Sequence, residues 1–234
     1  MRIGLLADVH GNIHGLNACF DELARAKVDK LFCAGDVIGY YPFVNEVIDA
    51  LKGKDVVTIK GNHEAYFLGE IPVTQERYQQ YSLDWVEKNI SVENREFIAQ
   101  LPESHQIVID GLKLIMFHGS PWSLEDYVYP NYEFFDRFLG FDADFIVLGQ
   151  THIPMLRRVG SVTIVNPGSC GQPRDYNPLA SCAVLDTETG EVDFRRTVYD
   201  VEAVCEKVRE EGLWPSLATI LKRTKSVTED KDSS

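Results

Sequence analysis

The sequence has few positive charges and no long apolar run. Its 234 residues contain 23 Lys and Arg against 36 Asp and Glu, so the formal net charge is −13. A surface this acidic repels phosphate backbones and anionic bilayers, which disfavours a long nucleic acid or a membrane as partner. No stretch approaches the roughly 18 apolar residues of a membrane span. The apolar start, residues 1–7, is too short for a secretory signal.

Paired cysteine motifs are also missing. The five cysteines are an odd number, scattered without any C-x-x-C, and are Cys19, Cys33, Cys170, Cys182 and Cys205. This usage favours reduced, mostly buried thiols and a cytoplasmic location. Apolar residues make up 44 % of the chain and charged residues 25 %, which excludes a disordered or collagen-like protein. The length suits one large α/β domain, which we expect to span residues 1–223.

Strands and helices alternate at the start of the chain. Short apolar runs predict strands at residues 2–8, 30–34 and 55–60, and helical spacing predicts helices at 16–23 and 43–51. This strand–helix repeat predicts a largely parallel sheet with right-handed crossovers.

The remainder follows a different pattern. Residues 65–101 are helical and rich in aromatics, which predicts a helical insertion over one end of the sheet. The second half is strand-rich, with predicted strands at 104–109, 112–117, 144–148, 155–159, 162–165, 181–186 and 191–199. A helix is predicted near residues 132–139, and two more after Asp200. The polar stretch 224–234 predicts a disordered tail.

Five short polar clusters each follow an apolar, strand-like run. They are Asp8-Val9-His10, Gly35-Asp36, Gly61-Asn62-His63-Glu64, His118-Gly119 and Gly149-Gln150-Thr151-His152. Ligands of parallel α/β sheets bind beyond the carboxyl ends of the strands, where all five clusters are expected. A lone His near a strand end is usually structural, but five clusters at five strand ends favour a shared metal site. Carboxylate, imidazole and amide groups together suit Mn, Fe or Zn better than an all-oxygen Ca²⁺ site.

In this order, the motifs D-x-H, G-D, G-N-H-[DE], H and G-H-x-H resemble the calcineurin-like metallophosphoesterase superfamily. The resemblance extends from Asp8 to about Asp186, and the segment 166–175 resembles its small bacterial and archaeal phosphodiesterase branch. It implies a four-layer α/β/β/α sandwich with a two-metal centre at the strand ends. Two divalent metals are therefore expected, with Mn favoured and Fe, Zn, Ni or Mg as alternatives.

The resemblance also implies roles for individual residues. The implied ligands are Asp8, His10 and His152 for one metal, Asn62 and His118 for the other, and Asp36 as the bridge. His63 would contact the scissile phosphate or protonate the leaving oxygen, while a hydroxide shared between the metals attacks phosphorus in line. Two such metals stabilise both the attacking and the leaving oxygen and lower the pKa of bound water.

Two positions depart from the family pattern. Gln150 stands where the family has the first His of G-H-x-H, and three interpretations are open: Gln150 ligates through its oxygen, water takes the place, or the second site is weak. We favour a retained but weaker site with a preference for Mn, because a carboxamide is a harder ligand than imidazole. Gly39 stands where some relatives have an acid that orients the His at position 63.

Two features hint at the substrate. Arg174 lies among turn residues in a chain poor in cations, and its fork suits phosphate, although a plain surface Arg is an equal alternative. The aromatic run 121–132 follows His118, and Tyr40 and Tyr41 follow Asp36. These aromatics either stack a nucleobase or belong to the core or a dimer contact.

The sequence thus predicts a metal-dependent phosphoesterase that acts on a small phosphodiester or nucleotide-like substrate. The first alternative is a diadenosine polyphosphate hydrolase or nucleotide pyrophosphatase. A second is a non-catalytic interaction module, since the retromer scaffold subunit shares this fold. A nuclease of the superfamily is disfavoured, because the chain has no basic stripe. A homo-oligomer is left open.

Overall fold

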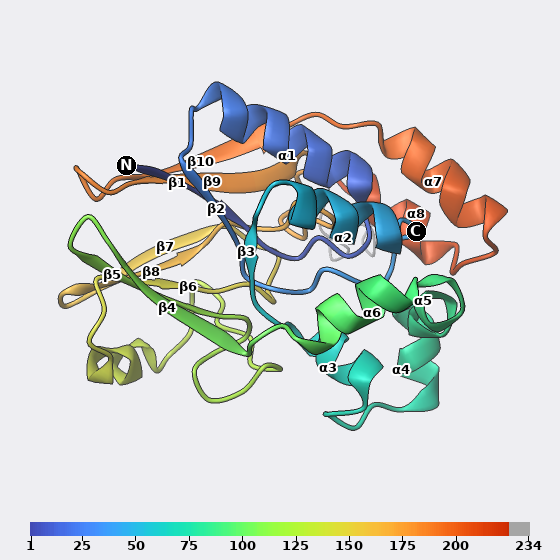
Figure 1. The fold of residues 1–234 in the computed structure, drawn as a ribbon, viewed down its shortest axis with the longest axis horizontal. Helices are drawn as coiled ribbons and strands as arrows, with labels where there is room; N and C mark the ends of the chain where they lie inside the picture. Colours follow the sequence, from blue (N-terminus) through green and yellow to red (C-terminus); the bar gives the residue numbers. More distant parts are fainter. Residues whose placement is uncertain (225–234) are drawn as a thin grey trace, which may run out of the picture.

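The structure of the chain is a computed structural model that describes residues 1–224. Two five-stranded sheets pack face to face, and helices flank them (Figure 1). The predicted disordered tail lies outside the described residues, except for Thr224. Within residues 1–224, no helix is both long and apolar enough to cross a membrane.

The first sheet has the strand order β10-β9-β1-β2-β3. Its strands are β1 (Arg2–Leu6), β2 (Lys30–Cys33), β3 (Val57–Thr58), β9 (Ala180–Asp186) and β10 (Val192–Thr197). The parallel pairing expected for the first three strands is confirmed, since β1 pairs parallel to β2 and β2 parallel to β3. In contrast, β9 runs antiparallel to both β1 and β10. The sheet is therefore mixed rather than largely parallel.

The second sheet is also mixed and has the order β4-β5-β6-β8-β7. Its strands are β4 (Ser104–Ile109), β5 (Leu112–Phe117), β6 (Phe145–Val147), β7 (Met155–Val159) and β8 (Val162–Asn166). Two-residue turns at Asp110-Gly111 and Gly160-Ser161 join β4 to β5 and β7 to β8. Both pairs are antiparallel, as expected, since a two-residue loop cannot connect parallel strands. The parallel neighbours β5, β6 and β8 direct their carboxyl ends to the same edge.

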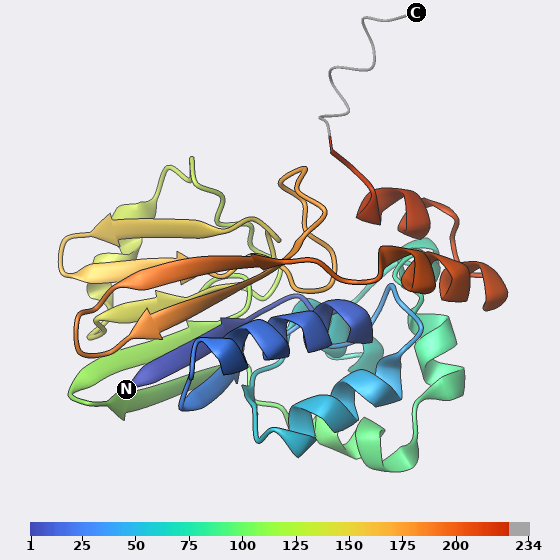
Figure 2. The same ribbon diagram turned by 90° about the horizontal axis from the view of Figure 1, so that it is seen from above.

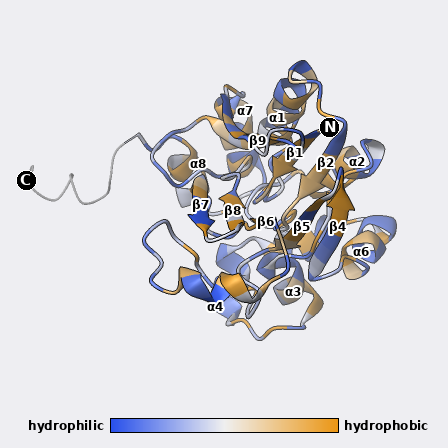
Figure 3. Ribbon diagram, turned by 90° about the vertical axis from the view of Figure 1, so that its left-hand side faces the viewer, coloured by the Kyte–Doolittle hydropathy of each residue, from blue (hydrophilic) through white to orange (hydrophobic). Residues whose placement is uncertain are grey.

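Alternating side chains divide the core into three layers. Ile3 and Leu5 of β1 face the second sheet, whereas Leu6 joins the cluster beneath the helices. Figure 3 shows the strands as mostly hydrophobic and the surrounding helices as mixed. The outer face of the second sheet is covered by Phe135 and Phe138. The helix predicted at 132–139 is here a 3₁₀ helix, η1 (Phe135–Gly140), so this fourth layer of the expected α/β/β/α sandwich is thin.

The helices cover the first sheet and one end of the sandwich. They are α1 (Ile13–Arg25), α2 (Val44–Gly53), α3 (Asn62–Leu68), α4 (Gln75–Gln80), α5 (Leu83–Asn89), α6 (Val92–Ala99), α7 (Val201–Glu210) and α8 (Ser216–Leu221). Helices α3 to α6 occupy the segment predicted to be helical. Figures 1 and 2 show α4 and α5 at the same end of the molecule as α7 and α8. Trp85 Nε1 of α5 donates to Glu211 Oε2, 3.0 Å away, and links the two groups.

Candidate metal centre

The five predicted clusters meet at the seam between the two sheets. Three of them follow β1, β2 and β3 of the first sheet, and two follow β5 and β6 of the second. They were expected at the strand ends of one parallel sheet, but the strand ends belong to two sheets. Packing the sheets face to face brings both sets of loops to the same edge, so residues more than a hundred positions apart become neighbours.

The backbone at this edge is held in an uncommon conformation. Positive φ angles occur at Asp8, His10, Asp36, Gln150 and His152. L-residues avoid this region of φ/ψ space, and such positions persist only where the surrounding structure imposes them. Of the eleven described non-Gly residues with positive φ, five are therefore residues that the sequence marks as candidate ligands.

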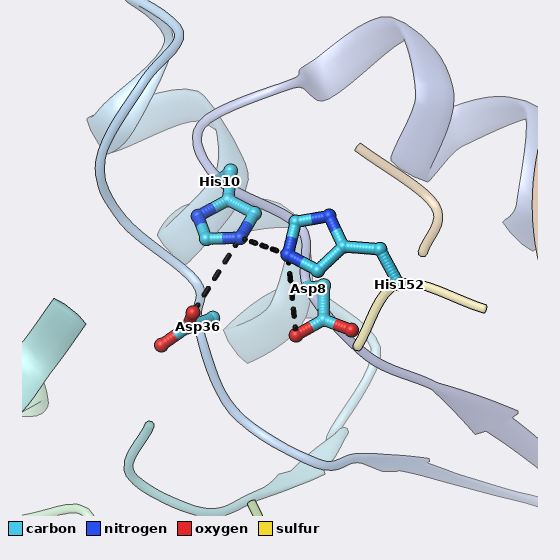
Figure 4. A group of neighbouring side chains, drawn as sticks. All are labelled: Asp8, His10, Asp36 and His152. Carbon is cyan, nitrogen blue, oxygen red and sulfur yellow. Dashed lines mark hydrogen bonds and ion pairs between the residues drawn. The ribbon is translucent and has the colours of Figure 1, made fainter. Parts of the chain in front are cut away.

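The first group of side chains contains Asp8, His10, Asp36 and His152, whose candidate ligand atoms all lie within 4.8 Å of one another (Figure 4). His10 Nε2 lies 3.1 Å from His152 Nε2 and 3.5 Å from Asp36 Oδ2. His152 Nε2 lies 3.9 Å from Asp8 Oδ1. All four side chains are buried, and they converge on one point.

A second group forms on the other side of the Asp36 carboxylate. His118 Nε2 lies 3.4 Å from Asp36 Oδ1, 3.0 Å from Asn62 Oδ1 and 3.1 Å from Gln150 Oε1. Asp36 therefore directs one oxygen to each group, which is the geometry of a bridging carboxylate. Gln150 points its carbonyl oxygen into this group, as the first of the three interpretations requires.

The hydrogen bonds of the histidines show that the site fits metal ions. Backbone carbonyls accept from Nδ1 of His10 (Ile38, 3.2 Å), His118 (Ala34, 2.7 Å) and His152 (Gln172, 2.6 Å). Each ring thus presents a bare Nε2 lone pair when it is neutral, the tautomer that binds metals. Two such lone pairs that face each other at 3.1 Å repel unless a cation lies between them. Asp8 Oδ2 is buried and has no hydrogen-bond partner among the described residues, so it too favours a bound cation.

Electrostatics supports the same conclusion. Burial lowers the pKa of His10 and His152 well below the ordinary value, so both are neutral ligands at pH 7. Burial raises the pKa of Asp8 to about 7. Burial also lowers the pKa of His118, but the Asp36 carboxylate outweighs it and raises this pKa to about 10. Without a metal, a proton on His118 is thus the countercharge of the second group.

The comparison with known proteins agrees with this geometry. The model of the calcineurin-like phosphoesterase superfamily domain matches residues 1–190. The chain belongs to this superfamily. The predicted superfamily is confirmed, and so is the predicted enzyme class, a hydrolase acting on phosphoric ester bonds. The superfamily is metal-dependent, and the buried Asp/His group is the corresponding feature of this chain.

Individual known proteins resemble the chain over most of its length. An uncharacterised protein of Methanocaldococcus jannaschii is 30 % identical over 224 residues, covering 88 % of this chain and 91 % of that protein. A crystal structure of a metallophosphoesterase from Sphaerobacter thermophilus has a TM-score of 0.83 and 27 % identity, covering 96 % and 99 % of the two chains. The phosphodiesterase YfcE of Escherichia coli is 23 % identical, covering 80 % and 89 %.

His63 lies buried beside this metallophosphoesterase centre, and within residues 1–224 no carboxylate accepts from its Nδ1. A Cβ at Gly39 would lie 2.3 Å from His63 Nδ1, and Gly39 has φ +90°, so neither space nor backbone accommodates the acid of some relatives. Aromatic rings hold the imidazole instead: the Tyr81 and Tyr40 centroids lie 4.5 and 4.8 Å from it. Tyr81, from the end of α4, carried no signal in the sequence that pointed to the site.

Glu64 is a second functional residue that sequence reasoning left without a role. Its buried carboxylate accepts from the N–H groups of Asp36 (3.0 Å), Val37 (2.8 Å), Ile38 (3.0 Å) and Gly61 (2.7 Å). It thereby ties the loop after β2 to the start of α3 and fixes the position of Asp36. The detectable signal was its place three residues after Gly61, the spacing of a helix capping box.

Arg174 lies near the centre. The aromatic residues of the run 121–132, in contrast, lie in two different places. Arg174 Nη2 lies 3.2 Å from the Tyr40 hydroxyl and 3.1 Å from Gln172 Oε1, two neutral partners. Trp122 packs on Phe138 and is part of the outer layer of the second sheet. Tyr127, 45 % exposed, stacks on Tyr129 at the surface.

Replacing Glu64 tests whether it positions Asp36. In Glu64→Gln, two N–H donors would face the amide NH₂ group, because each oxygen of the Glu64 carboxylate accepts from two N–H groups, so the Asp36 loop should shift. We expect Mn²⁺ affinity to fall by about 10- to 100-fold, as for other residues that orient metal ligands. Calorimetric titration measures the affinity, with exposed Glu96→Gln as the matched control. Equal affinity in both variants would contradict the role of Glu64.

The pKa of His118 predicts a proton release on metal binding. Metal-free protein at pH 7.5 carries a proton on His118, because its pKa is about 10. Binding a cation to the second group should displace about one proton, so the apparent affinity rises with pH up to that pKa. Calorimetry in buffers with different ionisation enthalpies counts the protons. His14→Gln, outside the centre, should leave the count unchanged, and a count of zero in the wild type would refute the prediction.

The same raised pKa gives the metal-free fold a pH dependence. The stabilisation by protonated His118 is fully present below the ordinary value of 6.5 and is lost as the pH rises through about 10.

Proposed function

We propose that this metallophosphoesterase is a phosphodiesterase that hydrolyses a small phosphodiester or nucleotide-like substrate at a two-metal centre. The observation that carries the proposal is the bridging geometry of Asp36, with one carboxylate oxygen facing each group of candidate ligands. One metal would be held by Asp8, His10 and His152, and the other by Asn62, His118 and Gln150. When bound, the two cations supply Lewis acidity at the phosphoryl group and lower the pKa of bound water.

Manganese is the metal we favour, because three of the four groups around the second position offer oxygen and only His118 offers nitrogen. Oxygen-rich sites suit harder cations than sites of imidazole and thiolate. Fe, Zn, Ni and Mg are the alternatives. The cytoplasm is the proposed compartment, since all five cysteines are free thiols.

Arg174 supplies the first contact for the phosphate. Its guanidinium is partly buried, and Tyr40 and Gln172 offer it only neutral oxygens. A cation held in this way gains most from an anion at its remaining N–H groups, and its fork matches two phosphoryl oxygens. The negative substrate therefore finds a fixed positive group in an otherwise acidic protein.

His63 acts as a neutral hydrogen-bond donor. Burial lowers its pKa to about 4, so the imidazole is uncharged at pH 7. Nδ1 is buried against Gly39 and has no partner in the part of the chain that the structure describes, whereas Nε2 lies 4.0 Å from Asp36 Oδ2, beside both groups of candidate ligands. Of the two roles that the sequence left open, this favours contact with a phosphoryl oxygen over protonation of the leaving group.

The completeness of the site disfavours a non-catalytic interaction module. Such a role requires neither seven convergent candidate ligands nor a strained backbone around them. A long nucleic acid is disfavoured as substrate by the net charge of −13. A small ester needs only the local positive charge of the metals and Arg174.

Two substitutions separate metal binding from catalysis. Asp36→Ala should abolish both the binding of two Mn²⁺ ions and the hydrolysis of bis-p-nitrophenyl phosphate, because the bridge is lost. His63→Ala should retain both ions and lower kcat by roughly 10²- to 10³-fold, the loss typical of removing one hydrogen-bond donor to a transition-state oxygen. Turnover is followed by p-nitrophenolate release and metal content by titration. A folded, metal-loaded wild type without turnover would defeat the proposal.

Gln150→His tests the second metal position. Imidazole is a softer and usually stronger ligand than a carboxamide, so the variant should bind the second ion more tightly, with the larger gain for Zn²⁺ than for Mn²⁺. Calorimetric titration with each metal gives the comparison. Equal affinity for the second ion in wild type and variant would show that Gln150 does not ligate.

A further inference from the structure

A cavity of about 310 Å³ lies beside the metal centre, between α4 and α8. Its walls are formed by Tyr40, Gln80, Tyr81, Trp214, Ser216, Leu217 and Ile220. In Figures 1 and 2 these two helices lie at the same end of the molecule. The volume is at the lower end of the range for small-ligand sites, large enough for one ring system rather than for a peptide.

Two of these walls are shared with the metal centre. The Tyr40 ring centroid lies 4.6 Å from that of His10 and 4.8 Å from that of His63. Tyr81 packs on His63 at 4.5 Å. The Tyr40 hydroxyl also accepts from Arg174, 3.2 Å away. A molecule in the cavity would therefore contact two rings that themselves contact His63 and Arg174, the residues proposed to contact the phosphate.

The lining suits a planar aromatic ring with polar edges. Tyr40, Tyr81 and Trp214 offer aromatic surfaces, and Leu217 and Ile220 complete an apolar lining. Trp214 is 44 % exposed, so the residues that the structure describes leave much of its ring uncovered. Gln80 offers a carboxamide that can hydrogen-bond to a ring edge. Aromatic stacking surfaces with few polar groups usually bind nucleobases without a strict preference for one base.

We propose that this cavity binds the base of a nucleoside phosphodiester whose phosphate lies at the metal centre. The inference rests on the proposed function and deepens it, because it selects the nucleotide class among small diesters. Trp214, Leu217 and Ile220 lie beyond residue 190, where the match to the superfamily domain ends. The C-terminal helices of this chain thus add base recognition to the phosphoesterase domain.

Two esters with the same leaving group test the proposal. The p-nitrophenyl ester of adenosine 5′-phosphate and methyl p-nitrophenyl phosphate both release p-nitrophenolate, so they differ only in the retained group. The ratio of their kcat/KM values should exceed tenfold in the Mn²⁺-loaded wild type. Trp214→Ala should lower this ratio by roughly tenfold, a typical loss for one base–aromatic stack. Trp214→Phe should keep most of the ratio, and Phe134→Ala, an exposed aromatic outside the cavity, should leave it unchanged.

A ratio near one in the wild type, or an unchanged ratio in Trp214→Ala, would overturn the base site while leaving the phosphodiesterase proposal intact. If neither ester is hydrolysed, the proposed function fails. Ligand binding then tests separately whether the cavity holds a base. Calorimetry should then give at least tenfold tighter binding of AMP than of ribose 5-phosphate, with the difference removed by Trp214→Ala. Equal binding of the two ligands by the wild type would overturn the base site.

Discussion

The Asp36 carboxylate lies buried where the two sheets meet, and both groups of candidate ligands are arranged around it. Its two oxygens face His10 and His118 from opposite sides, at 3.5 and 3.4 Å. A buried negative charge is costly unless positive charge compensates it. In the metal-free protein a proton on His118 meets part of this demand, and two divalent ions would meet all of it. The chemistry of the centre follows from this single constraint.

Hydrogen bonds from the surrounding structure hold that carboxylate and its neighbours in place. Glu64 draws together four backbone N–H groups around the Asp36 loop. Backbone carbonyls hold Nδ1 of three histidines, which leaves Nε2 free for the centre. These contacts offset the strain of the positive φ angles at the ligand positions. The candidate ligand atoms of the first group thus lie within 4.8 Å of one another before any metal binds.

Beside the candidate metal ligands, aromatic rings connect the centre to the neighbouring cavity. Tyr81 and Tyr40 orient His63 where some relatives use an acid, and Gly39 leaves the room for this arrangement. The same two rings form walls of the cavity under α8. In the proposed function, the orientation of His63 and the binding of the base therefore depend on the same two side chains.

Much of this protein could be predicted from local patterns. Apolar periodicity placed the strands and most helices, because the side-chain period of an element is a local property. The ligand types at five strand ends indicated a metal site, because carboxylate and imidazole carry their chemistry with them. The tertiary structure alone decided that the strand ends belong to two mixed sheets, that Gln150 turns its oxygen toward Asn62 and His118, and that Tyr81 lies on His63. Those features depend on contacts between distant segments, which packing creates and no local pattern records.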